Sequence, residues 1–177
     1  MNDTVKAYHG TTSDNAASIL RSEFRLSMGS AYFLGDGVYF FEENSYGEGL
    51  NSAKKWVRNN CSGLGVVLEA EITFGNVLDY SSNEHLSKLK NFRDKILNNA
   101  DIDEETKSKL KGQDSEGALL NMFCPKHNID VIRAVKNKNP NLGFSSRFVN
   151  STETYLCVRN IDNISNVTQI PWQNLRT

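Results

Sequence analysis

Three short segments of the chain carry side chains whose types and spacing suit ligand binding or catalysis. In the first, residues 8–12 read Tyr-His-Gly-Thr-Thr, so the imidazole of His9 stands at the end of a predicted strand, next to a glycine. Because Gly10 has no side chain, a ligand can approach the backbone closely at that point. The same residues also fit an ordinary strand end followed by a turn and a capped helix. This segment alone leaves both interpretations open.

The second segment, residues 34–40, reads Leu-Gly-Asp-Gly-Val-Tyr-Phe and combines a tight glycine turn with a tyrosine on the strand that follows. The flat ring of Tyr39 is suited to stack on a heteroaromatic ligand. A hairpin turn followed by core aromatic residues is the structural alternative.

The third segment, residues 151–160, alternates as a β-strand does. The alternation places Glu153, Tyr155 and Cys157 on one face of the strand. An ordinary sheet strand that begins with an exposed glutamate has the same pattern.

The spacing of apolar residues predicts the elements that must position these segments. Helical spacing indicates helices from an N-cap at 12–14 to Phe24, and over 50–57, 83–99, 101–111 and 114–123. Strand signals lie at 5–9, 38–41, 66–74, 129–135, 154–159 and 167–170, and a polar loop is expected over 137–150. Strand-rich ends around a helical middle predict an α+β fold with a mostly antiparallel or mixed sheet.

Composition excludes several classes of protein. The 177 residues include 20 Lys plus Arg and 21 Asp plus Glu, and a net charge of -1 argues against a broad clamp for nucleic acid or membrane. Cys61, Cys124 and Cys157 are too widely spaced for a disulfide framework or a CxxC zinc site, so no metal is expected. No stretch approaches the roughly 18 apolar residues of a spanning helix, and the first residues lack a signal peptide pattern. We therefore expect a cytoplasmic protein without a membrane partner.

In this order and spacing, the three segments resemble the ADP-ribosyltransferase superfamily. The nearer branch contains the poly(ADP-ribose) polymerases and diphtheria toxin, and it uses a His-Tyr-Glu signature: His-Gly-Ser/Thr, then Gly-x-Gly-Ile/Val-Tyr-Phe, then a late strand carrying Glu. The chain is also similar to small bacterial members of toxin or phage-defence type. The resemblance covers residues 8 to about 164 and is least supported over 81–126. It implies one catalytic domain over 1–177, in which 81–126 is a helical insertion.

The resemblance implies that NAD lies in a cleft between two small, split sheets flanked by helices. His9 would bond ribose hydroxyls, the backbone of Gly10 would bond the nicotinamide carboxamide, and Tyr39 would stack on the nicotinamide ring. Small residues or a second aromatic ring of the following helix would lie beneath that ring, with Ser52, Ala53 and Trp56 as the candidates. For Trp56 we favour packing in the core, because it falls on the apolar stripe. The full set of expected NAD-binding residues is His9, Gly10, Thr11, Tyr39, Ser52 and Ala53.

The third signature position departs from the family pattern. Aligning residues 155–160 on the family strand puts Tyr155 where Glu or Gln usually stands, with Glu153 two residues earlier on the same face. Either Glu153 stabilises an oxocarbenium-like transition state or activates the acceptor, or Tyr155 fills this position and the acceptor supplies the missing polarity. The expected catalytic residues are thus Glu153, Tyr155, His9 and Tyr39. Polymer synthesis is not expected.

The implied function is mono-ADP-ribosyl transfer from NAD to a protein, RNA or DNA acceptor, with release of nicotinamide. Residues Phe144, Ser146 and Arg147, in the loop before the last signature strand, are the acceptor-side candidates, and an antitoxin protein is a further partner that the resemblance leaves open. NAD glycohydrolase activity would use the same residues with water as acceptor. A non-catalytic module that binds NAD or ADP-ribose and a partner-binding scaffold that docks through 101–111 are the alternatives.

Overall fold

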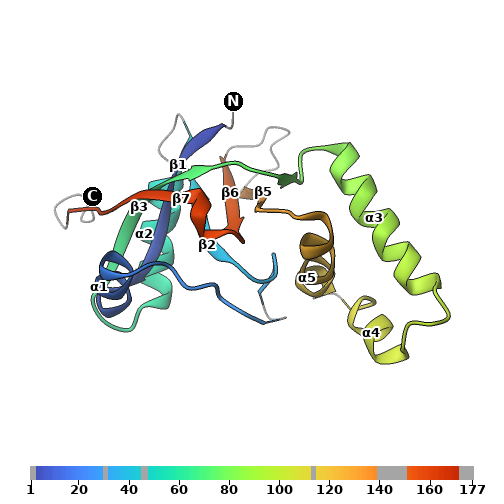
Figure 1. Cartoon of the computed structure of the whole chain (residues 1–177). Helices are drawn as coiled ribbons and strands as arrows, with labels where there is room; N and C mark the ends of the chain where they lie inside the picture. The colour runs from blue at the N-terminus through green and yellow to red at the C-terminus, as the bar shows by residue number, and fades with distance from the viewer. Residues whose placement is uncertain (1–2, 30–31, 45–47, 113–114, 139–150, 172–177) are drawn as a thin grey trace, which may run out of the picture.

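The computed structural model, which describes residues 3–29, 32–44, 48–112, 115–138 and 151–171, is organised around one β-sheet (Figure 1). Within these residues, seven strands form the sheet in the order β4-β5-β6-β2-β1-β3-β7. The strands are β1 (Thr4–Thr12), β2 (Val38–Glu42), β3 (Gly65–Thr73), β4 (Val77–Asp79), β5 (Val131–Lys138), β6 (Ser151–Val158) and β7 (Ile164–Gln169). Neighbouring strands are antiparallel except β4 and β5, which are parallel. The predicted α+β fold with a mostly antiparallel sheet is therefore confirmed.

The centre of the sheet combines one long strand pair and one short pair. β1 and β3 pair along their whole length, from Thr4 opposite Thr73 to Thr12 opposite Gly65. β1 and β2, by contrast, share a register of only two residue pairs, Ala7 with Glu42 and Tyr8 with Phe41. The two halves of the sheet therefore join at one end of β1 and separate at the other.

Helix α1 (Ser13–Arg21) begins where β1 ends, and it covers one face of the sheet. Its N-cap is Thr12, whose Oγ1 accepts a hydrogen bond from the Asn15 N–H at 3.3 Å. Such a cap satisfies one of the N–H groups that a helix leaves open at its start. Ala16 of this helix packs with Phe24 into the main hydrophobic core.

Helix α2 (Glu48–Asn60) covers the opposite face, over β1 and β3. Its fully buried Ala53 packs against Tyr8, Phe41 and Val67. Because both faces of this part of the sheet are covered, β3 is buried over most of its length.

The chain between β4 and β5 forms three helices, α3 (Asn83–Asn98), α4 (Glu104–Lys109) and α5 (Ser115–His127). Figure 1 shows them together at one end of the molecule, away from α1 and α2. Leu120 and Phe123 of α5 pack with Leu89 of α3 in a second core, which continues to Ile132 and Cys157 of the sheet. The helical middle expected from the sequence is therefore packed on the sheet through α5.

Two expectations about helices need correction. The first helix was expected to reach Phe24 but ends at Arg21; the Phe24 ring still packs in the core from the segment that follows. The charged stretch 101–111 was expected to be a solvated helix, but only Glu104–Lys109 is helical. Within that stretch, Lys107 and Leu110 are buried, because the turn after α4 packs against the neighbouring helices.

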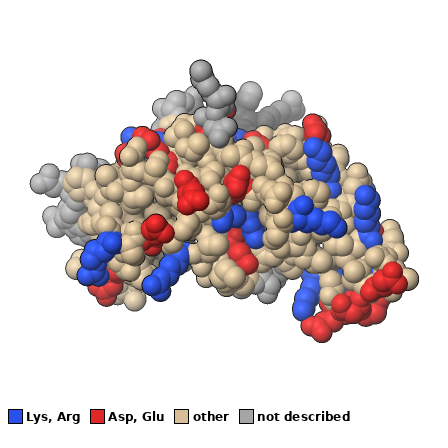
Figure 2. All heavy atoms as spheres, viewed as in Figure 1, with Lys and Arg blue, Asp and Glu red and all other residues tan. Residues whose placement is uncertain are grey.

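Charges of both signs are interspersed over the face drawn in Figure 2, with acidic atoms gathered where α4 lies. The exposed carboxylates there are Asp101, Asp103, Glu104 and Glu105. The mixture agrees with the balanced composition. Among the described helices, none is long and apolar enough to cross a membrane.

Candidate functional site

The candidate site lies where β1 and β2 separate. In the register that joins the two strands, the next opposed residues after Tyr8 and Phe41 that could exchange backbone hydrogen bonds are Gly10 and Tyr39. The Tyr39 carbonyl oxygen instead accepts a hydrogen bond from Nδ1 of His9 at 2.8 Å. The imidazole therefore occupies the place of the next backbone contact and holds the two strands apart.

The backbone of Gly10 faces the resulting opening. Successive strand residues direct their N–H and C=O groups to alternate sides. On the β2 side, the Lys6 carbonyl accepts a hydrogen bond from the Glu43 N–H at 2.8 Å. The N–H and C=O of Gly10, four residues further on, point to that same side, where β2 has already turned away. A planar amide can bond both groups there.

Glycine is required at position 10 for a second reason. A Cβ built on Gly10 would lie 2.9 Å from Trp56 Cε3, 2.9 Å from Val57 Cγ2 and 3.0 Å from the Ala53 carbonyl oxygen. Helix α2 therefore crosses directly over this glycine. Gly10 thus permits close approach of helix α2 on one side as well as close approach of a ligand to its backbone.

A cavity of about 500 Å³ opens at the separation of the strands. Side chains from both faces of the sheet line this cavity, because it lies in the gap between β1 and β2. The lining residues are His9, Gly10, Thr11, Asn15, Ser27, Tyr32, Phe33, Tyr39, Phe40, Phe41, Trp56 and Tyr155. No Asp, Glu, Lys or Arg is among these described residues, so the cavity itself is neutral and largely aromatic.

The ring of Tyr39 is held firmly at the centre of this aromatic wall. Its hydroxyl donates to the Gly35 carbonyl at 2.7 Å and accepts from the Leu34 N–H at 3.0 Å. Burial raises the pKa of this hydroxyl above its ordinary value, so the phenol keeps its proton. With the hydroxyl engaged, the ring face is what remains for a ligand.

Two aromatic rings that the sequence analysis did not single out extend this wall. Phe33 and Tyr32 lie with their ring centroids 5.3 and 5.9 Å from that of Tyr39. Their side chains are 52% and 41% exposed, which is high for large rings that pack on other rings. The consecutive Tyr-Phe ahead of the glycine turn was the signal available in the sequence.

His9 is built to act as a neutral imidazole. Its ring packs edge-on to Phe24, with centroids 5.3 Å apart, and lies 5.5 Å from Phe40. Removal from water lowers the pKa of His9 below its ordinary value, although the hydrogen bond to Tyr39 opposes this shift. A carbonyl oxygen can only accept, so Nδ1 carries the proton and Nε2 is an acceptor. Within the described chain Nε2 takes part in no hydrogen bond, and it can accept one from a ligand hydroxyl.

The carboxylate of Glu153 lies beside the aromatic wall, connected to it through Tyr155. The Tyr155 hydroxyl donates to Glu153 Oε2 at 2.8 Å, and the Ser52 hydroxyl of α2 donates to Oε1 at 2.8 Å. Burial, followed by the adjacent carboxylate, raises the pKa of Tyr155, so its proton remains in place for this bond. The face that alternation predicted for Glu153 and Tyr155 is confirmed.

The remaining predicted residues fall into separate groups. Thr11 is buried and lines the cavity. The Ser52 hydroxyl donates a hydrogen bond to Glu153. Ala53 packs in the core between α2 and the sheet. Trp56 was expected in the core, but its side chain is 41% exposed and lines the cavity, because the glycine beneath it lets the indole lie at the cavity edge. The acceptor-side candidates, Phe144, Ser146 and Arg147, lie outside the described residues.

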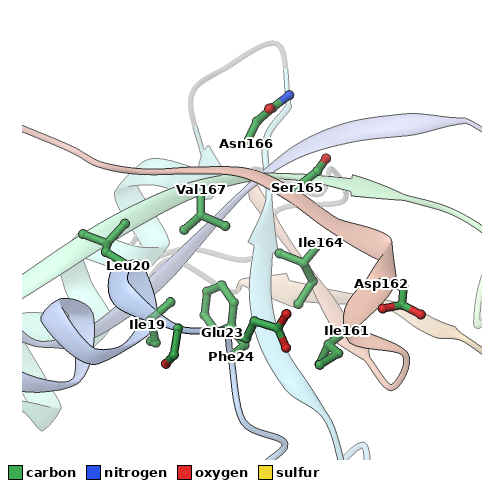
Figure 3. Close-up of a pocket in the computed structure, with 11 residues that line it drawn as sticks. Ile19, Leu20, Glu23, Phe24, Ile161, Asp162, Ile164, Ser165, Asn166 and Val167 are labelled. Atoms are coloured by element: carbon green, nitrogen blue, oxygen red, sulfur yellow. The ribbon is translucent and has the colours of Figure 1, made fainter.

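A second hollow, of about 340 Å³, lies between α1 and β7 (Figure 3). Ile19, Phe24 and Ile164 form part of its wall, and Glu23 and Asp162 lie at its rim. Among its described lining residues only Phe24 is aromatic, so it offers no aromatic wall for a flat ring. Among the described residues, no group of His, Cys, Asp and Glu side chains is arranged to hold a metal ion.

Comparisons with known proteins assign no chemistry. No protein-family model matches the chain. An uncharacterized protein of Methanocaldococcus jannaschii is 27% identical over 198 residues, an alignment that covers 95% of this chain and 86% of the archaeal protein. The similarity spans nearly the whole chain and carries no named activity.

Proposed function

We propose that this protein is an NAD-dependent mono-ADP-ribosyltransferase that transfers ADP-ribose to a macromolecular acceptor and releases nicotinamide. One observation supports this most directly: the separation of β1 and β2 gathers His9, the open backbone of Gly10 and the ring of Tyr39 around one neutral aromatic cavity. His9 and Tyr39 match the first two positions of the His-Tyr-Glu signature described above, and either Glu153 or Tyr155 fills the third.

The cavity suits the nicotinamide end of NAD. Nicotinamide in NAD is a positively charged, flat ring, and aromatic faces attract such rings. A neutral lining without Lys or Arg does not repel it. The backbone of Gly10 can bond its carboxamide, and the free lone pair of His9 Nε2 can accept a hydrogen bond from a ribose hydroxyl.

The proposed reaction breaks the bond between C1′ of the ribose and the ring nitrogen of nicotinamide. The bonding electrons leave with nicotinamide, which becomes neutral, and positive charge develops on the ribose. The Glu153 carboxylate stabilises that charge, with Ser52 and Tyr155 fixing its orientation. An acceptor nucleophile then bonds to C1′ and gives up its proton to the Glu153 carboxylate, from which it passes to water.

We place this activity in the cytoplasm, with a protein, RNA or DNA acceptor and with an antitoxin as a candidate partner. The test is incubation with NAD labelled in the adenylate part and a cell lysate. Label in protein and nucleic acid fractions and free nicotinamide are measured separately. Wild type should transfer label, whereas His9→Ala and Glu153→Gln should transfer it far more slowly. Glu84→Gln, at an exposed glutamate paired with Lys88, is the matched control. Absence of both label and nicotinamide would refute the proposal, and nicotinamide without label would make the protein a glycohydrolase.

A non-catalytic NAD-binding module is the second candidate. It is favoured by one observation: Glu153 is not among the residues that line the cavity, and both of its oxygens accept protein hydrogen bonds. Calorimetry that finds tight NAD binding by wild type, together with no release of nicotinamide, would establish this alternative.

A further inference from the structure

Two exposed rings of the cavity wall, Tyr32 and Phe33, belong to one loop, which we call the aromatic loop and define as residues 27–29 and 32–37. Its base is closed by Ser27 and Gly37, whose N–H and C=O groups bond each other at 3.0 Å in both directions. Tyr32 and Phe33 project from this loop and have large exposed fractions. Their position therefore depends on what supports the loop from behind.

Helix α5 supports the loop through Asn121. Its Oδ1 accepts from the Asp36 N–H at 2.7 Å, and its Nδ2 donates to Asp36 Oδ1 at 3.0 Å. The same Asp36 oxygen accepts from the Gly29 N–H at 2.8 Å on the other limb of the loop. One asparagine therefore connects, through Asp36, to both limbs.

The backbones of the loop and of α5 also meet closely. A Cβ on Gly117, one turn before Asn121 in α5, would collide with the Tyr32 carbonyl oxygen. Gly35 has a φ of 74°, and a Cβ there would collide with Asn121 Oδ1. These glycines let the loop lie directly on the first half of α5.

Asn121 also contacts the far end of the strand that carries Glu153. Arg159, which follows β6, donates from Nη1 to Asn121 Oδ1 at 3.1 Å. The amide oxygen thus receives two donors and the amide nitrogen has an acceptor, so the orientation of this side chain is fixed. Asn121 is half-buried, whereas its neighbours Leu119 and Leu120 enter the core.

We propose that Asn121 is a positioning residue for ligand binding, which acts by fixing the aromatic loop so that Phe33 and Tyr32 complete the wall beside Tyr39. This gives the helical middle of the chain a role at a cavity formed by the strand-rich ends. The effect on NAD rests on the proposed function, whereas the effect on loop order does not.

The first measurement is amide hydrogen exchange by NMR in Asn121→Ala. The informative amides are those of Gly29 and Leu34, which donate to Asp36 Oδ1 and to the Tyr39 hydroxyl, respectively, and not to Asn121. Both should exchange about tenfold faster or more, as expected for local opening, while amides of β3 keep their protection. Asn91→Ala, at an exposed asparagine of α3, is the control. Unchanged exchange at both amides would overturn the proposal.

The second measurement is the affinity for NAD, with turnover measured in parallel. Asn121→Ala should weaken NAD binding about tenfold, within the range for residues that act through a neighbour, and change kcat much less. Because Asn121 acts through the loop, the double variant Asn121→Ala/Phe33→Ala should lose less NAD-binding free energy than the sum of the losses in the two single variants. Full additivity would overturn the proposal.

A further variant separates the outcomes. Asn121→Asp keeps the acceptor for the Asp36 N–H but loses the donor to the Asp36 carboxylate, so the hydrogen exchange of the Gly29 amide should still become faster. If Asn121→Ala does not fold, the exchange rates in Asn121→Asp test the proposal instead. If wild type binds no NAD, the proposed function is wrong. The hydrogen exchange of the Gly29 and Leu34 amides then tests by itself whether Asn121 positions the aromatic loop.

Discussion

The imidazole of His9 replaces a backbone contact between two strands: Nδ1 donates to the carbonyl oxygen of Tyr39 at 2.8 Å where β1 and β2 part. One side chain therefore keeps the cavity open and contributes the Nε2 acceptor to it. The second task needs a neutral ring, because a protonated Nε2 can no longer accept a hydrogen bond.

The first prediction concerns pH. Burial lowers the pKa of His9 below the ordinary value of 6.5, so the unfolded chain binds a proton at this residue before the folded chain does. The stability contributed by neutral His9 is complete above pH 6.5 and is lost as the pH falls from there through the lowered pKa. We expect His9→Gln to reduce this loss, measured by urea unfolding at a series of pH values.

The control for this prediction is Asn91→Gln, which changes an exposed side chain of α3 that carries no titratable group. That variant should keep the pH dependence of wild type. Equal slopes of unfolding free energy against pH in wild type and His9→Gln would contradict the assignment of a neutral buried ring.

Local sequence patterns were sufficient for much of the site. Alternation placed Glu153 and Tyr155 on one face, and the hydrogen bond between them confirms it. An N-cap at Thr12 was also predictable, because a hydroxyl ahead of a helical apolar stripe is a local signal. Such features depend on neighbours within a few residues.

Contacts between distant segments were not predictable. Asp36 and Asn121 bond each other across 85 positions, and no local pattern marks Asn121 as a partner of the glycine turn. Trp56 shows the same limit: its place on the apolar stripe predicted a buried ring, but Gly10 beneath it and the cavity beside it decide its exposure. Tertiary packing overrode the helical pattern at that position.

The second prediction concerns Gly10. A methyl group at this position would press on Trp56, Val57 and the Ala53 carbonyl at 2.9 to 3.0 Å, so Gly10→Ala should lower the unfolding free energy by about 1–3 kcal/mol. Gly63→Ala is the matched control, since a Cβ there meets nothing within 4 Å. Its change should stay within about 0.5 kcal/mol. Urea denaturation measures both, and equal stability of the two variants would show that α2 can move away from β1.

The third prediction separates the ring of Tyr39 from its hydroxyl. Tyr39→Phe keeps the stacking surface but deprives the Leu34 N–H of its acceptor, which should cost about 1–3 kcal/mol of stability. NAD affinity should fall much less than in Tyr39→Ala. Tyr32→Phe is the control, because the Tyr32 hydroxyl bonds no described residue. A loss of stability as large in Tyr32→Phe would show that the bonds of Tyr39 are not its source.

The fourth prediction decides which residue fills the third signature position. If Glu153 stabilises the developing positive charge, Glu153→Gln should lower kcat about 10²–10³-fold while the affinity for NAD changes little, because the charge appears only in the transition state. Tyr155→Phe removes one hydrogen bond to that carboxylate and keeps the ring, so its loss of kcat should be smaller. Steady-state kinetics of nicotinamide release, with NAD affinity from calorimetry, distinguish the two. The opposite order, with Tyr155→Phe the more damaging, would assign the position to Tyr155 and leave Glu153 as its support.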